Sequence, residues 1–221
     1  MLKALHEFRS ISLHPWLMSD EEPSDLSKFV TSSARVMECF RILREIQARG
    51  EKALVFVDSR RLQKWLRVVL PSEFNLAEPP ACISGEVPGA RRQAMVNSFQ
   101  NLPAGFAVIL LSPRAAGIGL TLTAANNVIH LDRWWNPAVE DQCTDRVYRI
   151  GQERAVQVSL PIAQHPDPRI SETSFDLTLD RLMQRKRTQS RDLLNPVAMS
   201  EHDTAELFRD VCGEFADRDN D

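Results

Sequence analysis

Residues 107–111 read Ala-Val-Ile-Leu-Leu, a continuous apolar run of strand length, and a turn with two glycines, Gly117 and Gly119, follows within a few residues. An unbroken apolar run indicates a strand buried on both faces, as in a parallel sheet covered by helices. Ligands of such open sheets bind at the carboxyl ends of the strands. Glycine lets a backbone approach a phosphate closely, so the turn is predicted at a binding edge. The alternative is a tight connection without a ligand, which is the commoner role of such a turn standing alone.

Further strands and helices alternate on both sides of this run. Short apolar stretches predict strands at 53–57, 82–83, 128–131 and 156–158. Apolar residues at helical spacing predict a helix that opens after Ser33 and closes before Gly50, a second that ends at Pro71 and a third that starts at Pro88. This alternation predicts an α/β fold with an open parallel sheet and helices on both faces.

The two ends of the chain differ from this central region. Residues 1–34 predict a short helix and a solvated linker, and residues 35–163 hold the alternating strands and helices. Residues 164–221 predict a helical extension, with a long basic helix at 171–194 and a shorter helix near 205–215. We therefore expect one lobe with a helical segment at each end.

Charge and cysteine content narrow the classes of function. The 27 Lys and Arg residues against 30 Asp and Glu residues give a net charge of −3, which excludes a polybasic coat for nucleic acid but allows a local basic patch. The four cysteines form no Cys-x-x-Cys motif, so no metal site is predicted and a reducing compartment is favoured. No apolar run approaches the ~20 residues of a membrane span. We expect a cytoplasmic protein without a membrane partner, associated with the nucleoid if the source is bacterial.

Two arginines and a glutamine recur at helical spacing late in the central region. Gln142, Arg146 and Arg149 stand at i, i+4 and i+7, so a continuous helix would place them on one face. The neighbouring positions predict a buried face of three apolar residues, Cys143, Val147 and Ile150. Paired guanidinium groups offer forked donors that suit a polyphosphate. The alternative is a solvated helix in which Asp141 and Asp145 neutralise the arginines.

The sequence around these arginines carries a family resemblance. Residues 132–142 read Asp-Arg-Trp-Trp-Asn-Pro-Ala-Val-Glu-Asp-Gln, and residues 145–152 read Asp-Arg-Val-Tyr-Arg-Ile-Gly-Gln. Together with the glycine turn, they resemble the second RecA-like lobe of the Swi/Snf family of DNA-translocating ATPases, within helicase superfamily 2. The turn is similar to motif V of that family, and residues 145–152 are similar to motif VI.

The resemblance extends less specifically over residues 12–195. Residues 51–56 are similar to the motif IV strand, and residues 85–93 are similar to the start of the following helix. The chain departs from the family pattern at three positions, where Tyr148 replaces the usual histidine of motif VI and where motif V carries Pro113 and Ala116. Both arginines and both turn glycines are retained, so these departures affect the assignment to a subfamily and not the function that the resemblance implies.

The resemblance implies a role for each candidate site residue. Toward the nucleotide it implies catalytic roles for Arg146, Arg149 and Gln142 and binding roles for Gly117, Gly119 and Asp145. Toward DNA it implies contacts by Thr121, Trp134, Trp135 and Arg92. The alternative for each tryptophan is a place in the hydrophobic core.

The same resemblance assigns ATP and Mg²⁺ to an intact two-lobe enzyme. The sequence contains no Gly-x-x-x-x-Gly-Lys-Ser/Thr loop and no Asp-Glu-x-His/Asp pair, the features that hold the phosphates and the metal in such enzymes. We therefore expect this lobe to act with an N-terminal RecA-like lobe of the same polypeptide and with double-stranded DNA. Alone it is expected to hold no cofactor and to be inactive.

Two other functions are alternatives to this interpretation. A non-catalytic DNA-binding or protein-docking module is suggested by the basic face of the 171–194 helix, which carries Arg181, Arg185, Lys186, Arg187 and Arg191. The alternative for that face is simple solvation. An RNA helicase lobe of the DEAD-box kind is disfavoured, because its last motif ends in Arg-x-Gly-Arg and Gln152 takes the final position here.

Overall fold

The centre of the molecule is one five-stranded sheet. The computed structural model describes residues 2–19, 25–116, 119–192 and 200–216. The strands are β1 Lys52–Phe56, β2 Ala81–Ile83, β3 Ala107–Leu111, β4 Asn127–His130 and β5 Gln157–Ser159. They lie in the order β2-β3-β1-β4-β5, and all neighbours are parallel. The predicted open parallel sheet is confirmed.

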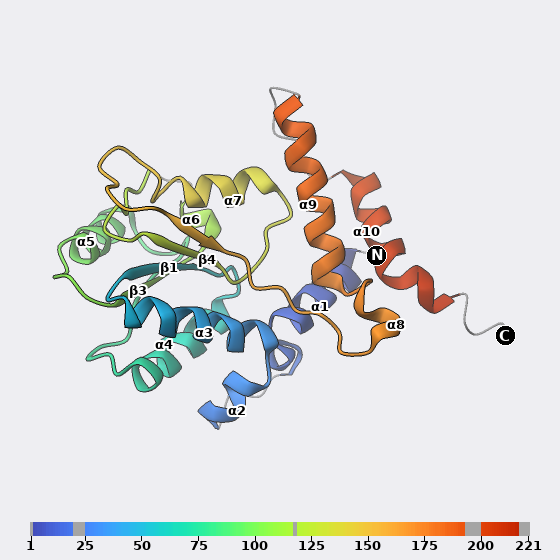
Figure 1. The fold of residues 1–221 in the computed structure, drawn as a ribbon, viewed down its shortest axis with the longest axis horizontal. Coiled ribbons are helices and arrows are strands. Elements are labelled where there is room, and N and C mark those ends of the chain that lie inside the picture. Colours follow the sequence, from blue (N-terminus) through green and yellow to red (C-terminus); the bar gives the residue numbers. More distant parts are fainter. Residues whose placement is uncertain (1, 20–24, 117–118, 193–199, 217–221) are drawn as a thin grey trace.

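Alternate side chains of the central strands enter two different hydrophobic layers. The helices of these layers are α3 Ala34–Ala48, α4 Arg60–Phe74, α5 Gly89–Gln100, α6 Pro113–Ala116 and α7 Pro137–Thr144. On one face, Val55 and Leu110 pack with α3 and α4. On the other, Leu54 and Ile109 pack with α5, α6 and α7. Figure 1 shows the sheet between these two groups of helices.

A third group of helices lies beside one end of the sheet (Figure 1). It contains α1 Leu2–Leu13, α8 Pro168–Ser171, α9 Phe175–Asp192 and α10 Glu201–Ala216, and two short elements precede α3, a 3₁₀ helix Pro15–Met18 and α2 Leu26–Thr31. Leu5 of α1, Leu179 of α9 and Leu207 of α10 share one buried cluster. The long helix predicted at 171–194 is observed as α9, but it begins at Phe175 and not at Ser171. Ser171 instead ends the separate helix α8, which the Asp167 side chain caps at the Arg169 amide, 3.0 Å away.

Local sequence signals predict both ends of α3 correctly, whereas a proline in α4 does not mark the end of that helix. The Ser33 hydroxyl accepts from the Val36 amide at 3.1 Å, and Gly50 follows the helix with a φ of +62°, so both predicted ends are confirmed. The predicted end of α4 at Pro71 is wrong, since the helix continues to Phe74. A proline in the last turn removes a single backbone hydrogen bond. The burial of Phe74 outweighs that loss.

Candidate functional site

The turn that follows β3 exposes the Thr121 hydroxyl between two buried leucines. Leu120 and Leu122 are buried in the layer beside α7, whereas Thr121 between them is exposed. Gly119 has a φ of +47°, in the left-handed region that glycine adopts without strain. Gly117 lies outside the described residues. The turn therefore presents Thr121 at the carboxyl edge of the sheet.

Residues 145–151, called the arginine segment below, form tight turns after α7. The helix ends at Thr144, whose hydroxyl lies 3.1 Å from His130 Nε2. The Arg146 carbonyl accepts from the Leu122 amide at 2.9 Å, which ties the segment to the turn after β3. The predicted single helix through 142–150 is therefore wrong, because this hydrogen bond diverts the backbone from the helical ladder.

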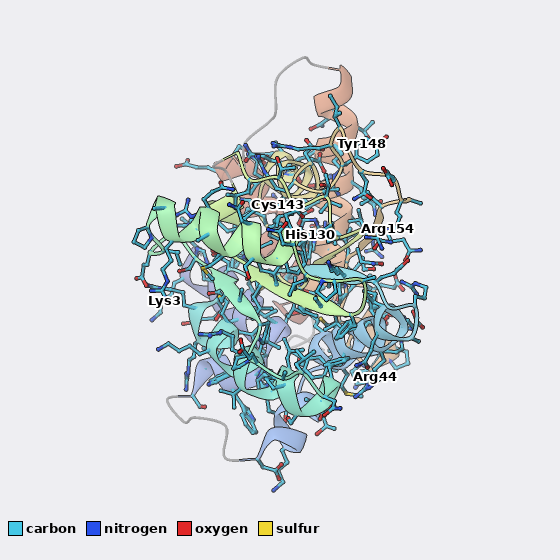
Figure 2. The ribbon with its side chains drawn as sticks, turned by 90° about the vertical axis from the view of Figure 1, so that its left-hand side faces the viewer. Lys3, Arg44, His130, Cys143, Tyr148 and Arg154 are labelled. Carbon is cyan, nitrogen blue, oxygen red and sulfur yellow. The ribbon has the colours of Figure 1, made fainter. Side chains whose placement is uncertain are left out.

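Burial along the arginine segment follows the prediction only in part. Cys143 and Val147 are buried, as predicted, but Ile150 is fully exposed at 104%. Tyr148 is also 73% exposed, and Figure 2 shows it at the rim of the molecule with Cys143 and His130 inside. Burial lowers the pKa of His130 to about 4, so its ring is neutral where it meets Thr144.

Arg149 connects the arginine segment to the turn after β3. Its Nη1 donates to the Thr121 hydroxyl at 3.0 Å and to the Gly119 carbonyl at 3.4 Å. Its Nε donates to the Asp145 carbonyl at 3.0 Å, while the Asp145 side chain is exposed. Four residues predicted to serve nucleotide or DNA therefore meet in space.

Arg146 is a buried cation that forms no ion pair with any described residue. Only 5% of it is exposed, and its Nε has no hydrogen-bond partner among the described residues. Burial lowers the pKa of Arg146, and the nearby charge of Arg149 lowers it further, whereas the charge of Asp145 raises it in part. Within the described ranges Arg149 also forms no ion pair, and Asp141 bonds instead to Arg187 at 3.1 Å. The alternative in which Asp141 and Asp145 form ion pairs with the two arginines is therefore not found in the described part of the chain.

A groove of about 690 Å³ opens beside Arg149. It is lined by Thr121, Tyr148, Arg149, Ile150, Gln152 and Arg154. The Gln152 side chain is fixed in the wall of this groove, because its Nε2 donates to the Ala125 carbonyl at 2.7 Å. Arg154 was not among the predicted site residues, since it stands outside the spacing of the other arginines. Gln142 is exposed on α7, within the helix that leads into the arginine segment.

The two tryptophans occupy different surroundings. Two guanidinium groups lie near the Trp134 ring, with Arg9 and Arg114 at 5.6 and 5.5 Å from its centroid, whereas among the described residues only Arg9, also at 5.6 Å, lies near the Trp135 ring. Trp135 packs against Phe175 of α9 at 6.1 Å and belongs to the cluster of the third helix group. Trp134 is thus the ring in the more cationic setting, and Trp135 is partly a packing residue. Arg9 and Arg114 carried no sequence signal, because their contact with Trp134 depends on the tertiary fold.

Arg92 is buried in this structure instead of lying on the surface. Its exposed fraction is 5%, and its Nη2 donates to the Val87 carbonyl at 2.9 Å. Its Nε and Nη1 have no hydrogen-bond partner among the residues that the structure describes. In this conformation the side chain is held against the start of α5, so a DNA contact by Arg92 remains a prediction.

Comparisons with known proteins connect this geometry to a family. Residues 34–151 match the sequence model of the helicase conserved C-terminal domain. The chain is 32% identical to a Sulfolobus solfataricus SWI2/SNF2 ATPase core solved in complex with dsDNA, over 95% of this chain and 41% of that one, with a TM-score of 0.70. This chain belongs to the Swi2/Snf2 family of helicase C-terminal domains. Its fold is the RecA-like α/β fold that the sequence resemblance implied.

Curated relatives of this helicase domain are much longer than the chain. It is 38% identical to the Zorya protein ZorD of Escherichia coli O139:H28, over 88% of this chain and 17% of that protein. It is 32% identical to the putative ATP-dependent helicase/translocase YwqA of Bacillus subtilis, over 94% of this chain and 22% of that protein. The chain therefore spans about a fifth of the length of these relatives. A solved Sulfolobus solfataricus SWI2/SNF2 C-terminal domain is similar over 79% of its own length, at 29% identity and a TM-score of 0.65.

The basic face of α9 is neutralised within the helicase domain. Each described cation of this face bonds to a carboxylate: Arg181 to Glu172, Arg185 to Glu206, Lys186 to Asp203, and Arg187 to Glu140 and Asp141. The Arg191 side chain lies outside the described residues. The observation that favoured a separate docking module, a free basic face, is therefore absent from the described part of α9.

In the described part of the chain, no three His, Cys, Asp or Glu side chains are gathered as metal ligands would be. No helix among the same residues has the length and apolar character needed to cross a bilayer.

Proposed function

We propose that this chain is the second ATPase lobe of an ATP-dependent translocase on double-stranded DNA. In this proposal Arg146 and Arg149 reach the terminal phosphate of ATP bound between two lobes. The observation that supports it is a pair of neighbouring guanidinium groups at the carboxyl edge of the sheet, one of them desolvated and neither ion-paired with a described residue. A desolvated cation without a counterion is costly, and a polyphosphate supplies the missing negative charge.

The residues around the arginines fit a role in holding that charge. Arg149 is directed by the Thr121 hydroxyl and the Gly119 carbonyl, so its fork is placed before a ligand arrives. Gln142 would position the phosphates or the attacking water, and Gly117 and Asp145 would complete the nucleotide side. Mg²⁺ supplies charge neutralisation at the phosphates when bound, and we assign its ligands to the first lobe.

DNA would contact the same edge of the sheet. The relative solved with dsDNA supports this choice of partner. Thr121 offers an exposed hydroxyl beside Arg149, and the exposed Arg114 lies 5.5 Å from the centroid of the Trp134 ring, so the chain presents hydroxyl, cationic and aromatic groups of the kinds that contact a DNA backbone. Trp135 and Arg92 are assigned to DNA only through the family resemblance. These groups suit contacts with the phosphate backbone of DNA, so we expect the affinity to depend little on base sequence.

The isolated chain is expected to show no ATPase activity above background, with or without duplex DNA. Its arginines stabilise charge in the transition state but cannot by themselves hold the nucleotide and metal. The measurement is phosphate release by the purified chain, with a two-lobe protein that contains it as the positive control. DNA-stimulated turnover by the chain alone, abolished by Arg149→Ala, would place the whole active site within these residues and contradict the proposal.

DNA binding by the chain is expected to be weak, insensitive to sequence and steeply dependent on salt. For about three phosphate contacts, affinity should fall roughly 40-fold when salt rises from ~50 to ~200 mM. Arg114→Ala should reduce the salt slope by about one contact, whereas Arg44→Ala on the exposed face of α3 should leave it unchanged. Fluorescence anisotropy on two unrelated duplexes measures all three quantities. A salt-independent complex would contradict the backbone-contact proposal.

A further inference from the structure

Glu140 of α7 is a buried carboxylate that joins three parts of the molecule. It is 2% exposed, and its Oε1 accepts from Arg133 Nε at 2.9 Å and from the Trp134 amide at 3.0 Å. Its Oε2 accepts from Arg187 Nη2 of α9 at 2.8 Å. Burial would raise the pKa of Glu140, but the charge and hydrogen bonds of Arg133 lower it overall. The carboxylate therefore stays ionised and binds both arginines.

Arg187 makes a second connection between the same two helices. Its Nη2 and Nε donate to the Asp141 carboxylate at 3.1 and 3.3 Å, so one guanidinium binds two successive carboxylates of α7. It is partly buried, with 26% of its side chain exposed. Arg133 adds an ion pair to Asp180 of α9. Two arginines and three carboxylates thus connect α9 to α7 and to the start of the tryptophan pair.

The helix held by these contacts leads directly into the arginine segment. α7 ends at Thr144, and Asp145 donates its amide back to the Asp141 carbonyl at 2.9 Å. Arg146 and Arg149 follow two and five residues after Thr144. A change in the tilt of α7 would therefore displace both guanidinium groups, and a misplacement of about 1 Å can cost ~100-fold in rate.

We propose that Arg187 is a positioning residue, through which the C-terminal helix α9 sets the placement of the arginine segment and of Trp134. This inference rests on the proposed function, but its structural part concerns contacts within the chain alone. The planar fork of arginine is essential to the proposal, because a lysine cannot bind two carboxylates in the same geometry.

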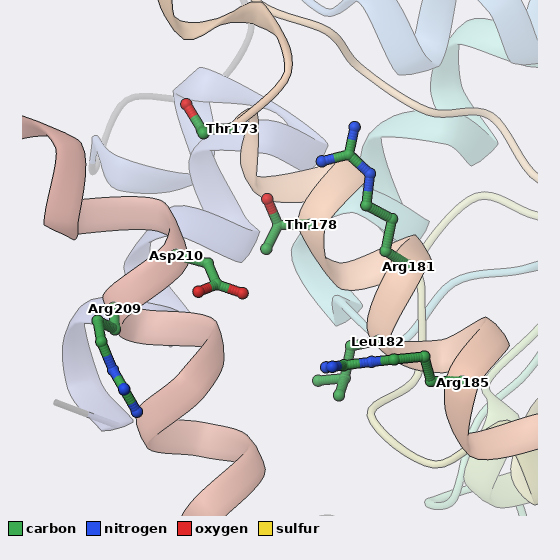
Figure 3. Close-up of a pocket in the computed structure, with 7 residues that line it drawn as sticks. All are labelled: Thr173, Thr178, Arg181, Leu182, Arg185, Arg209 and Asp210. Atoms are coloured by element: carbon green, nitrogen blue, oxygen red, sulfur yellow. The ribbon is translucent and has the colours of Figure 1, made fainter. Parts of the chain in front are cut away.

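Arg185 provides a matched control on the same helix. It bonds to Glu206 of α10 at 2.8 Å, the distance that Arg187 keeps to Glu140, and it lines the pocket between α9 and α10, where it points toward α10 (Figure 3). Arg187→Ala and Arg185→Ala each remove one arginine of α9 with its ion pairs, two for Arg187 and one for Arg185. Only the first removes a contact with α7.

Hydrogen exchange on the isolated chain tests the structural part. Arg187→Ala should speed exchange of the Leu122 amide and the amides of the arginine segment roughly tenfold, because the lost bonds to charged groups held α7 in place. Arg185→Ala should leave these amides unchanged, and Arg187→Lys should give an intermediate rate. Equal exchange in Arg187→Ala, Arg185→Ala and the parent chain would overturn the proposal. If Arg187→Ala fails to fold, the Arg187→Lys comparison carries the same test.

Steady-state kinetics in a two-lobe enzyme test the functional part. Arg187→Ala should lower kcat for DNA-stimulated ATP hydrolysis about tenfold, with KM for ATP within about twofold, and Arg187→Lys should restore part of the loss. Arg185→Ala should stay within about twofold of the parent in kcat. Arg149→Ala is run in parallel. If it abolishes activity while Arg187→Ala behaves like Arg185→Ala, the positioning proposal fails and the proposed function stands. If Arg149→Ala is active, the proposed function itself fails.

Discussion

Arg149→Ala in a two-lobe enzyme is expected to lower kcat for ATP hydrolysis by about 10³-fold or more, the range that arginine fingers contribute in phosphoryl transfer. A finger meets negative charge chiefly as it develops in the transition state, so KM for ATP should change far less than kcat. Arg146→Ala should have an effect of the same order. The measurement is steady-state phosphate release at saturating duplex DNA, with ATP varied to separate kcat from KM.

Lysine variants and stability measurements decide between a catalytic and a structural role. Lysine at 146 or 149 should rescue little, because a point charge does not reproduce the guanidinium fork. Among the described residues, Arg149 bonds to Thr121, to Gly119 and to the carbonyl of Asp145, all near the surface, so its loss should leave the Tm nearly unchanged. Arg44→Ala, an exposed arginine paired with Glu73, serves as the control. Near-normal hydrolysis with a markedly lower Tm in Arg149→Ala would make this segment structural and refute its catalytic assignment.

Local sequence patterns predicted the sheet well because their causes are local. Each buried strand is a short apolar run, and α3 begins and ends at side-chain and glycine signals within a few residues of its ends. The order of the strands follows less directly, since β2 joins the edge of β3 while β1 lies between β3 and β4. That order depends on which faces the connecting helices cover, which no single stretch of sequence specifies.

The helical pattern failed where a tertiary contact overrode it. The sequence of residues 142–150 has helical spacing, yet the Arg146 carbonyl accepts a hydrogen bond from the Leu122 amide and not from an amide of a continuing helix. The helix therefore does not continue, and Ile150 is exposed. The prediction at Pro71 erred in the opposite direction: α4 was expected to end there, but it continues to Phe74, whose side chain is buried. In both cases a contact distant in sequence outweighs a local preference of about 1–3 kcal/mol.

Ion pairs between remote segments were beyond the reach of sequence patterns. Arg9 bonds to Asp132, 123 residues away, and this pair helps to set the cations around Trp134. The basic face of α9 was interpreted as free or DNA-binding, whereas its partners come from three other parts of the chain. The family resemblance, not spacing alone, is what brought the arginines and the turn of Thr121 into one predicted site.

Asp176→Ala is expected to destabilise the chain by about 3–5 kcal/mol, the usual cost of breaking a buried ion pair from one side. Asp176 of α9 is 1% exposed and binds three other segments: it accepts from Ser12 Oγ of α1 at 2.6 Å, from Arg35 Nη1 of α3 at 3.3 Å and from the Ala163 amide at 2.8 Å. Arg35 is itself 1% exposed, and its Nε and Nη2 have no hydrogen-bond partner in the described part of the chain. Removing the carboxylate would leave this guanidinium buried and uncompensated.

Urea and thermal unfolding of the isolated chain measure this loss, and the Tm should fall by roughly 6–20 °C for a domain of this size. Glu73→Gln, which breaks the exposed pair with Arg44, should produce no resolvable change. The double variant Arg35→Met, Asp176→Leu should recover much of the lost stability, because replacing both charges by apolar groups removes the uncompensated ion. If Asp176→Ala unfolded like Glu73→Gln, the third helix group would be held by its apolar cluster alone. If instead the double variant were as unstable as the single one, the hydrogen bonds to Ser12 and Ala163 would be the dominant contribution, since they are lost in both.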